Sequence, residues 1–123
     1  MSSRTQIQGQ AWERVAESWL ATRGLITICR GYRCRSGELD LICRDRETLV
    51  IVEVRARRSR SHGGAAASID KRKRSRIIRA TRHFLMHHAE LNALPVRFDV
   101  FAIDDAASTD PELVWISDAF QAS

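Results

Sequence analysis

Residues 37–57, GELDLICRDRETLVIVEVRAR, decide the fold of this chain because they contain two strand patterns separated by a short polar break. Apolar and polar side chains alternate along the first half, and β-branched residues dominate the second. Alternation with a period of two is typical of strands, so we expect a β-hairpin whose turn lies within residues 45–48. The break contains neither Asn-Gly nor Asp-Gly, so the sequence leaves the type of turn open.

The register of this hairpin is the same for a turn of two residues and for a turn of four. It places Asp40 opposite Glu53 and Glu38 opposite Arg55, with the Cβ atoms of each pair roughly 4.5–5.5 Å apart. We therefore predict a neutralising pair between Glu38 and Arg55. A three-residue turn or a bulge would break the register.

The predicted placement of Asp40 opposite Glu53 can be interpreted in two ways. Asp40 and Glu53 could line the exposed polar face of an antiparallel hairpin, where they would repel each other. They could instead bind a divalent cation, since hard cations such as Mg²⁺ take carboxylate oxygens and reverse the sign of the interaction. The second interpretation is favoured because Leu49 and Ile51 share the predicted face of Glu53. A strand that is apolar on both faces is covered on both, and charges at the edge of a covered cleft tend to be paired or to hold a metal.

Length and composition indicate one globular domain. We treat residues 1–123 as a single domain with a modest core, in which residues 1–8 are frayed. No apolar run approaches the ~20 residues of a membrane span, and the N-terminus lacks a signal-peptide pattern. We expect a cytoplasmic protein with no membrane partner. The three cysteines include no CxxC, which predicts buried reduced thiols rather than a zinc site or a disulfide framework.

The basic residues gather in one segment. Residues 55–82 contain eleven Lys or Arg and one acid, whereas the remainder contains nine bases and fourteen acids. Helix charges that are merely solvated would intersperse the two signs. A basic segment directly after an acidic strand end is expected where a phosphate backbone lies beside a metal site. We predict nucleic acid as the partner, with these contacts: Arg57, Arg58, Arg60, Lys71, Arg72 and Arg76.

The flanking patterns predict the order α-βββ-α-ββ, that is, an α/β fold with a mixed β-sheet flanked by helices. In chain order, the expected elements are a helix over 9–23, strands over 25–35, 37–44 and 49–57, a long helix from about 65 or 70 to 91, and strands over 96–103 and 113–116. We expect a bulge or bend at Gly31 and a helix cap at Asp70. Residues 117–120 are predicted to form a closing turn or a helical stub.

Two side chains of the predicted helices can point toward the hairpin. Glu13 borders the apolar stripe of the first helix, and Lys73 lies on the row of Ile77 in the second. Lys73 either snorkels over the edge of the core or contacts the carboxylates or a phosphate. His83 and His87 have the i, i+4 spacing of a metal pair but no evident third ligand, and we expect no metal there.

Short motifs occur in a fixed order along most of the chain. They are WERVA (12–16), RGL (23–25), GELDLI (37–42), VEVRAR (52–57), AAASI (65–69) followed by Lys73, RFDV (97–100) and DAF (118–120). Taken together, they resemble the motifs of the YraN family. These are small bacterial proteins for which a restriction-endonuclease-like fold, related to Holliday-junction resolvases, is expected.

The resemblance implies a member of the PD-(D/E)xK superfamily, in which Asp and Glu hold Mg²⁺ or Mn²⁺ and a Lys positions the attacking water. It implies that Asp40 and Glu53 are metal ligands and that Glu13 is a further acidic ligand or a water-orienting group. Two positions differ from the pattern. Arg55 occupies the position of the superfamily Lys and is a poor proton acceptor because it stays protonated, so Lys73 could supply the ammonium group. Trp12 replaces the family's glycine beside the helix glutamate.

The sequence patterns and the family resemblance lead to three hypotheses about function. The first is a Mg²⁺-dependent endonuclease acting on structured DNA, and the second is a DNA-binding protein that keeps the fold without the chemistry. Metal-dependent cleavage that Asp40→Asn abolishes separates these two. The third is an adaptor whose basic helix binds an acidic protein, and here nucleic acid would fail to compete for that surface. A homodimer is compatible with the resemblance, although nothing in the sequence fixes an interface.

Overall fold

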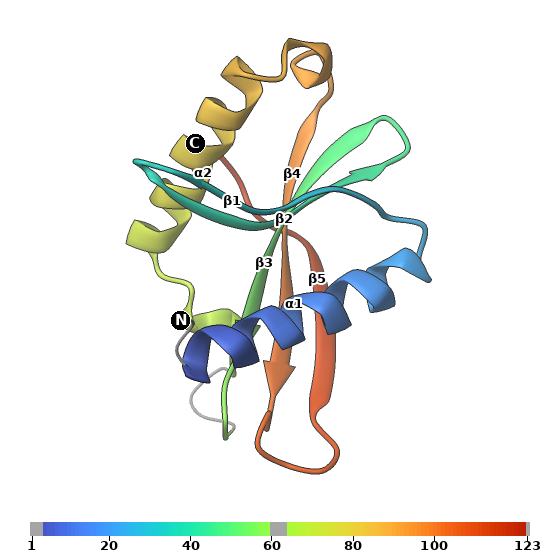
Figure 1. Ribbon diagram of the computed structural model, residues 1–123, viewed down its shortest axis with the longest axis vertical. Coiled ribbons are helices and arrows are strands. Elements are labelled where there is room, and N and C mark those ends of the chain that lie inside the picture. The colour runs from blue at the N-terminus through green and yellow to red at the C-terminus, as the bar shows by residue number, and fades with distance from the viewer. Residues whose placement is uncertain (1–3, 60–63, 123) are drawn as a thin grey trace.

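The structure, a computed structural model, describes residues 4–59 and 64–122 and confirms the predicted order of elements (Figure 1). The elements are α1 (Arg4–Ala21), β1 (Ile26–Cys34), β2 (Gly37–Asp45), β3 (Thr48–Ala56), the 3₁₀ helix η1 (Ala66–Ser68), α2 (Lys71–Met86), the 3₁₀ helix η2 (Ala89–Leu91), β4 (Val96–Asp104) and β5 (Glu112–Phe120).

The five strands form one mixed sheet in the order β1-β2-β3-β4-β5. The first three strands form an antiparallel meander, β4 pairs with β3 in parallel, and β5 returns antiparallel to β4. A parallel neighbour requires a crossover connection, which residues 57–95 with α2 supply. The expected α/β fold, with a mixed sheet flanked by helices, is therefore confirmed.

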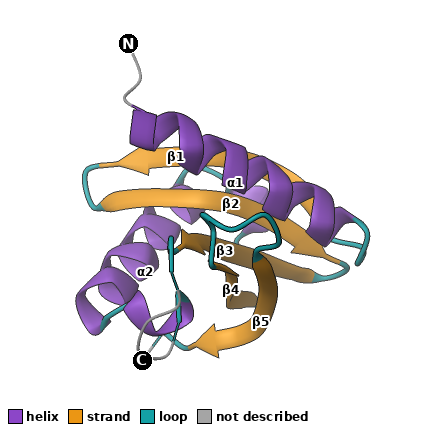
Figure 2. Cartoon of the chain, turned by 90° about the horizontal axis from the view of Figure 1, so that it is seen from below, coloured by secondary structure: helices purple, strands orange, loops and turns teal. Residues whose placement is uncertain are grey.

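The two helices cover opposite faces of the sheet (Figure 2). Ala16 and Leu20 of α1 pack in one apolar cluster with Val52, whereas Ile77 of α2 packs in a second cluster with Ile51. Successive side chains of a strand point to opposite faces, so β3 contributes to both clusters. Its run of apolar residues reflects this double coverage, as the sequence predicted.

Both helices begin and end at residues other than those predicted from the sequence. The first begins at Arg4, so the part of segment 1–8 that the structure describes is helical, while residues 1–3 lie outside the described residues. The second is divided into η1, α2 and η2. The break before α2 occurs because Ile69 and Asp70 are extended, and the Asp70 side chain accepts a hydrogen bond from the backbone N–H of Lys73 at 2.8 Å. This contact is the predicted N-terminal cap.

Of the bulge or bend predicted at Gly31, the register shift of a bulge lies elsewhere in β1. The register with β2 shifts between Thr27 and Cys29, and the pairs around Gly31 are regular. Gly31 has a φ of 59°, which a glycine adopts readily, so the chain bends there without an extra residue.

The expectation of a closing turn or helical stub at 117–120 was wrong, because β5 continues through Phe120. The ring of Phe120 stacks on Phe98 of β4 with centroids 5.0 Å apart, and both side chains are buried. Burial of this aromatic pair holds the end of β5 against β4. The register between the two strands shifts between Phe98 and Val100, and Asp118 takes a φ of 55° nearby.

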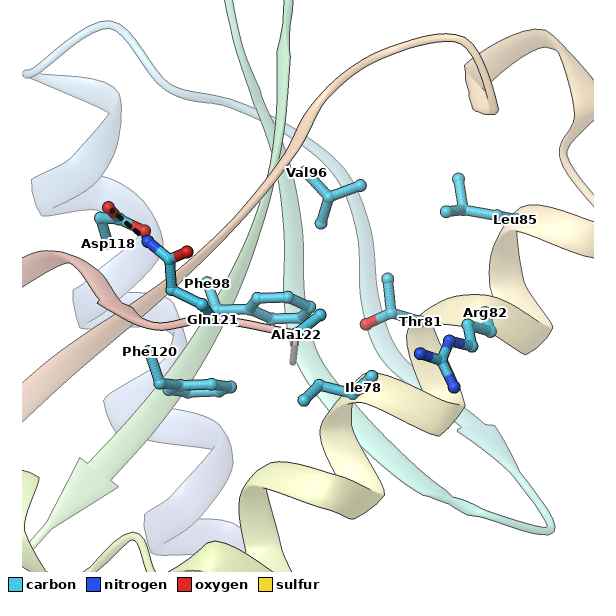
Figure 3. A pocket seen from close by; sticks show the side chains of 10 residues that line it. All are labelled: Ile78, Thr81, Arg82, Leu85, Val96, Phe98, Asp118, Phe120, Gln121 and Ala122. Carbon is cyan, nitrogen blue, oxygen red and sulfur yellow. Dashed lines mark hydrogen bonds between the residues drawn. The ribbon is translucent and has the colours of Figure 1, made fainter.

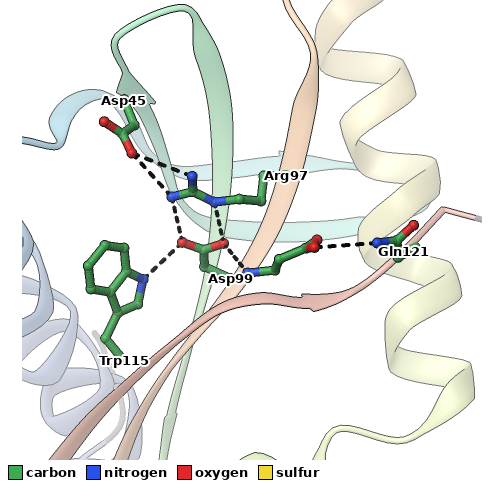
Figure 4. Close-up of polar contacts among 6 residues, drawn as sticks. Asp45, Arg97, Asp99, Trp115 and Gln121 are labelled. Atoms are coloured by element: carbon green, nitrogen blue, oxygen red, sulfur yellow. Dashed lines mark hydrogen bonds and ion pairs between the residues drawn. The ribbon is translucent and has the colours of Figure 1, made fainter.

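A buried polar network around Asp99 fixes β5 on β4 (Figure 4). The Asp99 carboxylate accepts hydrogen bonds from Arg97 Nε, Trp115 Nε1 and the backbone N–H of Asp118, each at 2.9 Å. Arg97 also contacts Asp45 at the end of β2, at 3.4 Å. A buried charge needs such donors to offset its lost hydration, and this network spans β2, β4 and β5.

None of the helices in the described part of the chain is long and apolar enough to cross a membrane. The three cysteines form no disulfide bond, and Cys29 and Cys34 are only half-buried, which differs from the expected buried thiols. Cys43 is buried in the sheet, and burial raises the pKa of its thiol to about 11.

Candidate metal and nucleic-acid site

The predicted register of the central hairpin is confirmed, but the ladder ends just before the two carboxylates. Pairing runs from the turn as far as Leu41 opposite Val52. Beyond this pair, the backbone N–H of Val54 donates a hydrogen bond to Asp40 Oδ2 at 2.9 Å. The side chain of Asp40 therefore takes the place of a strand partner. Asp40 and Glu53 lie where β2 and β3 diverge, next to the last regular pair.

The predicted pair between Glu38 and Arg55 does not form. Glu38 lies opposite Arg33 of β1, and its Oε1 is 3.5 Å from Arg33 Nε. Arg55 instead donates through Nε to Ser68 Oγ at 2.7 Å, and that hydroxyl donates to the carbonyl of Ala65. The prediction failed because the β2–β3 ladder ends before these two residues can meet.

Lys73 reaches the carboxylates from α2. Its Nζ lies 3.6 Å from Glu53 Oε1, and the side chain of Glu53 is only 5% exposed. The two alternatives for Lys73 are thereby resolved in favour of contact with the hairpin. Because the Asp70 cap binds the backbone N–H of Lys73, the cap also fixes the residue whose ammonium group reaches the sheet.

The carboxyl groups of this site have raised pKa values. Burial, and then the charge of Asp40, raises the pKa of Glu53 to about 8. Burial also raises the pKa of Asp40, against its backbone hydrogen bond and the charge of Lys73. Burial and then the charges of Asp40 and Glu38 raise the pKa of Glu13 to about 7. The charges of Lys73 and Arg55 lower the pKa of Glu53, but burial and the charge of Asp40 outweigh them.

The donor set suits a hard divalent cation. Asp40 and Glu53 offer carboxylate oxygens, and Mg²⁺ is often held by one or two carboxylates together with water and substrate oxygens. A bound cation would also stabilise the charged forms of both carboxyl groups, which burial disfavours. Among the described residues, no three His, Cys, Asp or Glu side chains form a cluster that could hold a metal ion. Glu13 thus forms no three-ligand cluster with the pair among the described residues, although the charge of Asp40 raises its pKa.

His83 connects α2 to β1 and lies beside His87, the residue that caps the end of the helix. The hydroxyl of Tyr32 forms a hydrogen bond with Nδ1 of His83, and the rings of His83 and His87 lie 4.5 Å apart. Nδ1 of His87 bonds to the carbonyl of His83 at 2.9 Å. These contacts give the pair a structural role at the surface between α2 and the meander.

The described residues predicted to contact nucleic acid are all on the surface. These exposed residues are Arg57, Arg58, Lys71, Arg72 and Arg76. Arg60 lies outside the described residues. The backbone N–H of Arg57 donates to the carbonyl of Ile103 at 2.9 Å, so parallel pairing with the β4 chain continues past β3. Because Arg55 is bonded to Ser68, three residues before α2 begins, the end of β3 lies close to the segment that leads into the basic first turn of α2.

Two hollows lie along α2. A cleft of about 410 Å³ lies between α2 and the β1–β2 turn, and its lining includes Lys73 and Arg76. A second hollow of about 390 Å³ lies between α2 and the end of β5, where Phe98, Phe120 and Arg82 contribute to its lining (Figure 3). The first hollow contains predicted site residues and the second does not.

The sequence predictions missed two residues of the site. Arg33 had a usable signal, since the two-residue turn at 35–36 places it directly opposite Glu38. Ser68 had none, because its bond to Arg55 joins segments that only the fold brings together.

A family model described as "Uncharacterised protein family UPF0102" matches residues 12–103, a range that includes Glu13, Asp40, Glu53 and Lys73. A UPF0102 protein of Aeromonas hydrophila is 49% identical over 114 residues, covering 92% of this chain and 84% of the relative. One of Alcanivorax borkumensis is 44% identical over 112 residues, covering 91% and 90%. One of Legionella pneumophila is 39% identical over 118 residues, covering 96% and 98%. None of these names states an activity.

Proposed function

Because this chain belongs to the uncharacterised protein family UPF0102, the YraN family that its motifs resemble, we propose its function from the site itself. We propose that it is a DNA-binding protein of the PD-(D/E)xK type that hydrolyses phosphodiester bonds with the help of Mg²⁺ or Mn²⁺. The observation that carries this proposal is the convergence of Asp40, Glu53 and Lys73 where β2 and β3 diverge.

Each side chain has a role that suits its surroundings. Asp40 and Glu53 hold the cation, and Asp40 is oriented by the N–H of Val54. When bound, the cation polarises the phosphate and lowers the pKa of water. Lys73, beside Glu53, donates hydrogen bonds to a phosphate oxygen or to the attacking water. Glu13 has a pKa near 7, which suits a group that accepts a proton at neutral pH.

Arg55 serves a different purpose from the superfamily lysine. A guanidinium stays protonated and therefore binds phosphate without accepting a proton. Its Nε is held by Ser68, which leaves the terminal nitrogens for a phosphate oxygen. The ammonium group of the site comes from α2 in this proposal, and the strand position supplies a phosphate ligand.

The basic residues after β3 and on α2 supply the affinity for DNA. Arg and Lys side chains neutralise backbone phosphates and release bound counterions, so binding weakens as salt rises. The resemblance to Holliday-junction resolvases supports branched or otherwise structured DNA as the substrate.

A second function is a DNA-binding or protein-binding module on the same fold, without catalysis. The placement of Arg55 favours it, because the strand position normally occupied by a lysine holds a residue that is bonded to Ser68. The two functions share the binding surface and differ only in whether metal-dependent cleavage occurs.

A cleavage assay tests the proposal. End-labelled duplex, single-stranded and four-way-junction DNA would be incubated with the protein and Mg²⁺ or Mn²⁺, with EDTA as a control. We expect cutting that Asp40→Asn reduces about 100-fold or more, since a metal ligand contributes several kcal/mol to catalysis. Binding of the junction by Asp40→Asn should stay close to that of the wild type.

The other outcomes are equally informative. Binding of all substrates without cutting would contradict the nuclease and support the module. Equal cutting by wild type and Asp40→Asn would exclude the carboxylate pair as the catalytic site. Failure to bind any of the three DNAs would favour an acidic protein as the partner of the basic surface.

A further inference from the structure

The cleft between α2 and the β1–β2 turn adjoins the carboxylate site without being part of it. Gly37 brings the turn into contact with the helix, since a Cβ added at Gly37 would lie 3.4 Å from Cβ of Arg76. Arg33 and Glu38 line the cleft from the turn, and Lys73 and Arg76 line it from α2. The cleft has a volume of about 410 Å³, enough for a phosphate and part of its nucleoside.

The charges in this cleft are unbalanced. Glu38 is its acid and is engaged by Arg33 at 3.5 Å, while Lys73 is engaged by Glu53 at 3.6 Å. Arg76 is exposed and has no acidic partner among the described residues. The cleft therefore presents one uncompensated guanidinium next to a second that is 71% exposed and weakly paired. Planar guanidinium groups bind phosphate oxygens through paired donors.

Lys73 connects the cleft to the carboxylates. It lines the cleft, and its Nζ contacts Glu53 in the adjoining site. An anion bound between Arg33 and Arg76 would thus lie next to the place proposed for the reacting phosphodiester. Successive phosphates of a nucleic-acid strand offer this arrangement, because one strand can occupy both places at once.

We infer that the cleft binds a backbone phosphate of the nucleic-acid strand whose neighbouring phosphodiester lies at Asp40 and Glu53. This inference rests on the proposed function. Arg76 is the principal ligand, and Arg33 turns from Glu38 to the phosphate. Lys73 lies between the two phosphates, and Arg33 joins the nucleic-acid contacts that the sequence predicted.

The test compares two arginines of the same helix. Arg76→Ala and Arg82→Ala remove the same charge from exposed positions of α2, but Arg82 lines the hollow beside β5 and not the cleft (Figure 3). Binding of a fluorescein-labelled four-way junction would be followed by anisotropy in EDTA over a series of salt concentrations. We expect Arg76→Ala to weaken binding about 3–10-fold at ~100 mM salt, and to reduce the slope of log K against log salt by about 0.9.

Arg82→Ala should change the affinity less than about twofold and leave the slope unchanged. Arg76→Lys keeps the charge and should recover most of the slope but not the full affinity, because it lacks the paired donors. Circular dichroism would establish that each variant is folded. Equal losses for Arg76→Ala and Arg82→Ala would overturn the inference while leaving DNA binding intact.

The inference and the proposed function fail in different ways. If the wild type does not bind the junction, both are overturned. If the loss is specific to Arg76→Ala but the wild type cuts no DNA with Mg²⁺ or Mn²⁺, the phosphate site stands and hydrolysis does not.

Discussion

Asp40 accepts a hydrogen bond from the backbone of Val54, and this bond exists because a strand ladder ends. The N–H of Val54 donates to Asp40 Oδ2 at 2.9 Å, one step beyond the last regular pair of β2 and β3. A buried backbone donor without an acceptor costs about 1–3 kcal/mol. The carboxylate therefore has a structural function as well as its proposed chemical one, and substitutions at this position must separate the two.

Two substitutions of Asp40 make this separation. Asp40→Asn and Asp40→Ala both remove the charge beside Glu53, but only the amide keeps an oxygen for the N–H of Val54. We expect Asp40→Asn to be more stable than Asp40→Ala by about 1–3 kcal/mol in urea denaturation. Equal stability of the two variants would mean that this hydrogen bond contributes nothing to folding.

Glu53 makes stability depend on pH. Its pKa in the folded protein is raised from the ordinary 4.5 to about 8. The folded state therefore binds this proton more tightly than the unfolded state does. The resulting stability is fully present below pH 4.5 and is lost as pH rises through about 8. Because Gln carries no titrating proton, Glu53→Gln should not show this loss.

The measurement is the thermal midpoint of wild type and Glu53→Gln in EDTA between about pH 5 and pH 9. The thermal midpoint of the wild type should fall relative to that of Glu53→Gln as pH rises. Glu47→Gln, at a side chain that is 86% exposed, serves as the control and should follow the wild type. If the thermal midpoints of wild type and Glu53→Gln change with pH in parallel, the Glu53 carboxyl does not cause the pH dependence of stability.

At the scale of elements, the N-terminus of α2 brings the parts of the site together. Asp70 caps the helix through the N–H of Lys73, and the side chain of the same lysine reaches Glu53. Just before it, η1 supplies the Ser68 hydroxyl that holds Arg55. The cap therefore sets both where the helix starts and where its lysine points.

Removing the cap should weaken the helix. Asp70→Ala should cost about 1 kcal/mol of unfolding free energy, whereas Asp70→Ser, which keeps a capping oxygen, should cost less. Chemical denaturation measures both values, with Asp110→Ala in the exposed β4–β5 loop as the control. A loss for Asp70→Ala no larger than for Asp110→Ala would contradict the capping role.

The elements also show what the sequence could predict. Local patterns were sufficient for the meander and for the cap, because strand alternation, a two-residue turn and an Asp before a basic helix are properties of neighbouring residues. They were insufficient for the end of β5, whose course depends on the burial of Phe120 against Phe98. The start of α1 also differed, since helical structure extends back to Arg4 without an apolar stripe that would predict it.

The candidate site was predictable to a similar degree. The register of the hairpin located Asp40 beside Glu53, and the row of Ile77 placed Lys73 toward the sheet. The error at Glu38 and Arg55 arose because opposed positions were assumed to remain paired beyond the last hydrogen-bonded step. Only the three-dimensional structure shows that the β2–β3 ladder ends at Leu41 and Val52 and that Arg55 donates a hydrogen bond to Ser68.

At the scale of the whole molecule, charge is divided between one basic segment and an acidic remainder. Residues 55–82 contain eleven bases and one acid, and within this segment Lys73 contacts Glu53 while Arg55 is bonded to Ser68 just before α2. Such a surface attracts a polyanion from a distance. Two raised carboxyl pKa values beneath that surface indicate a place where one further positive charge would be stabilised.

The central claim is that Asp40 and Glu53 bind a divalent cation, and calorimetric titration with Mn²⁺ at about pH 8 tests it directly. Wild type and the control Glu47→Gln should each bind one ion per chain. Asp40→Asn and Glu53→Gln should lose this binding, since each removes one of two proposed ligands. Unchanged Mn²⁺ binding by Asp40→Asn, or no binding by the wild type, would contradict the account.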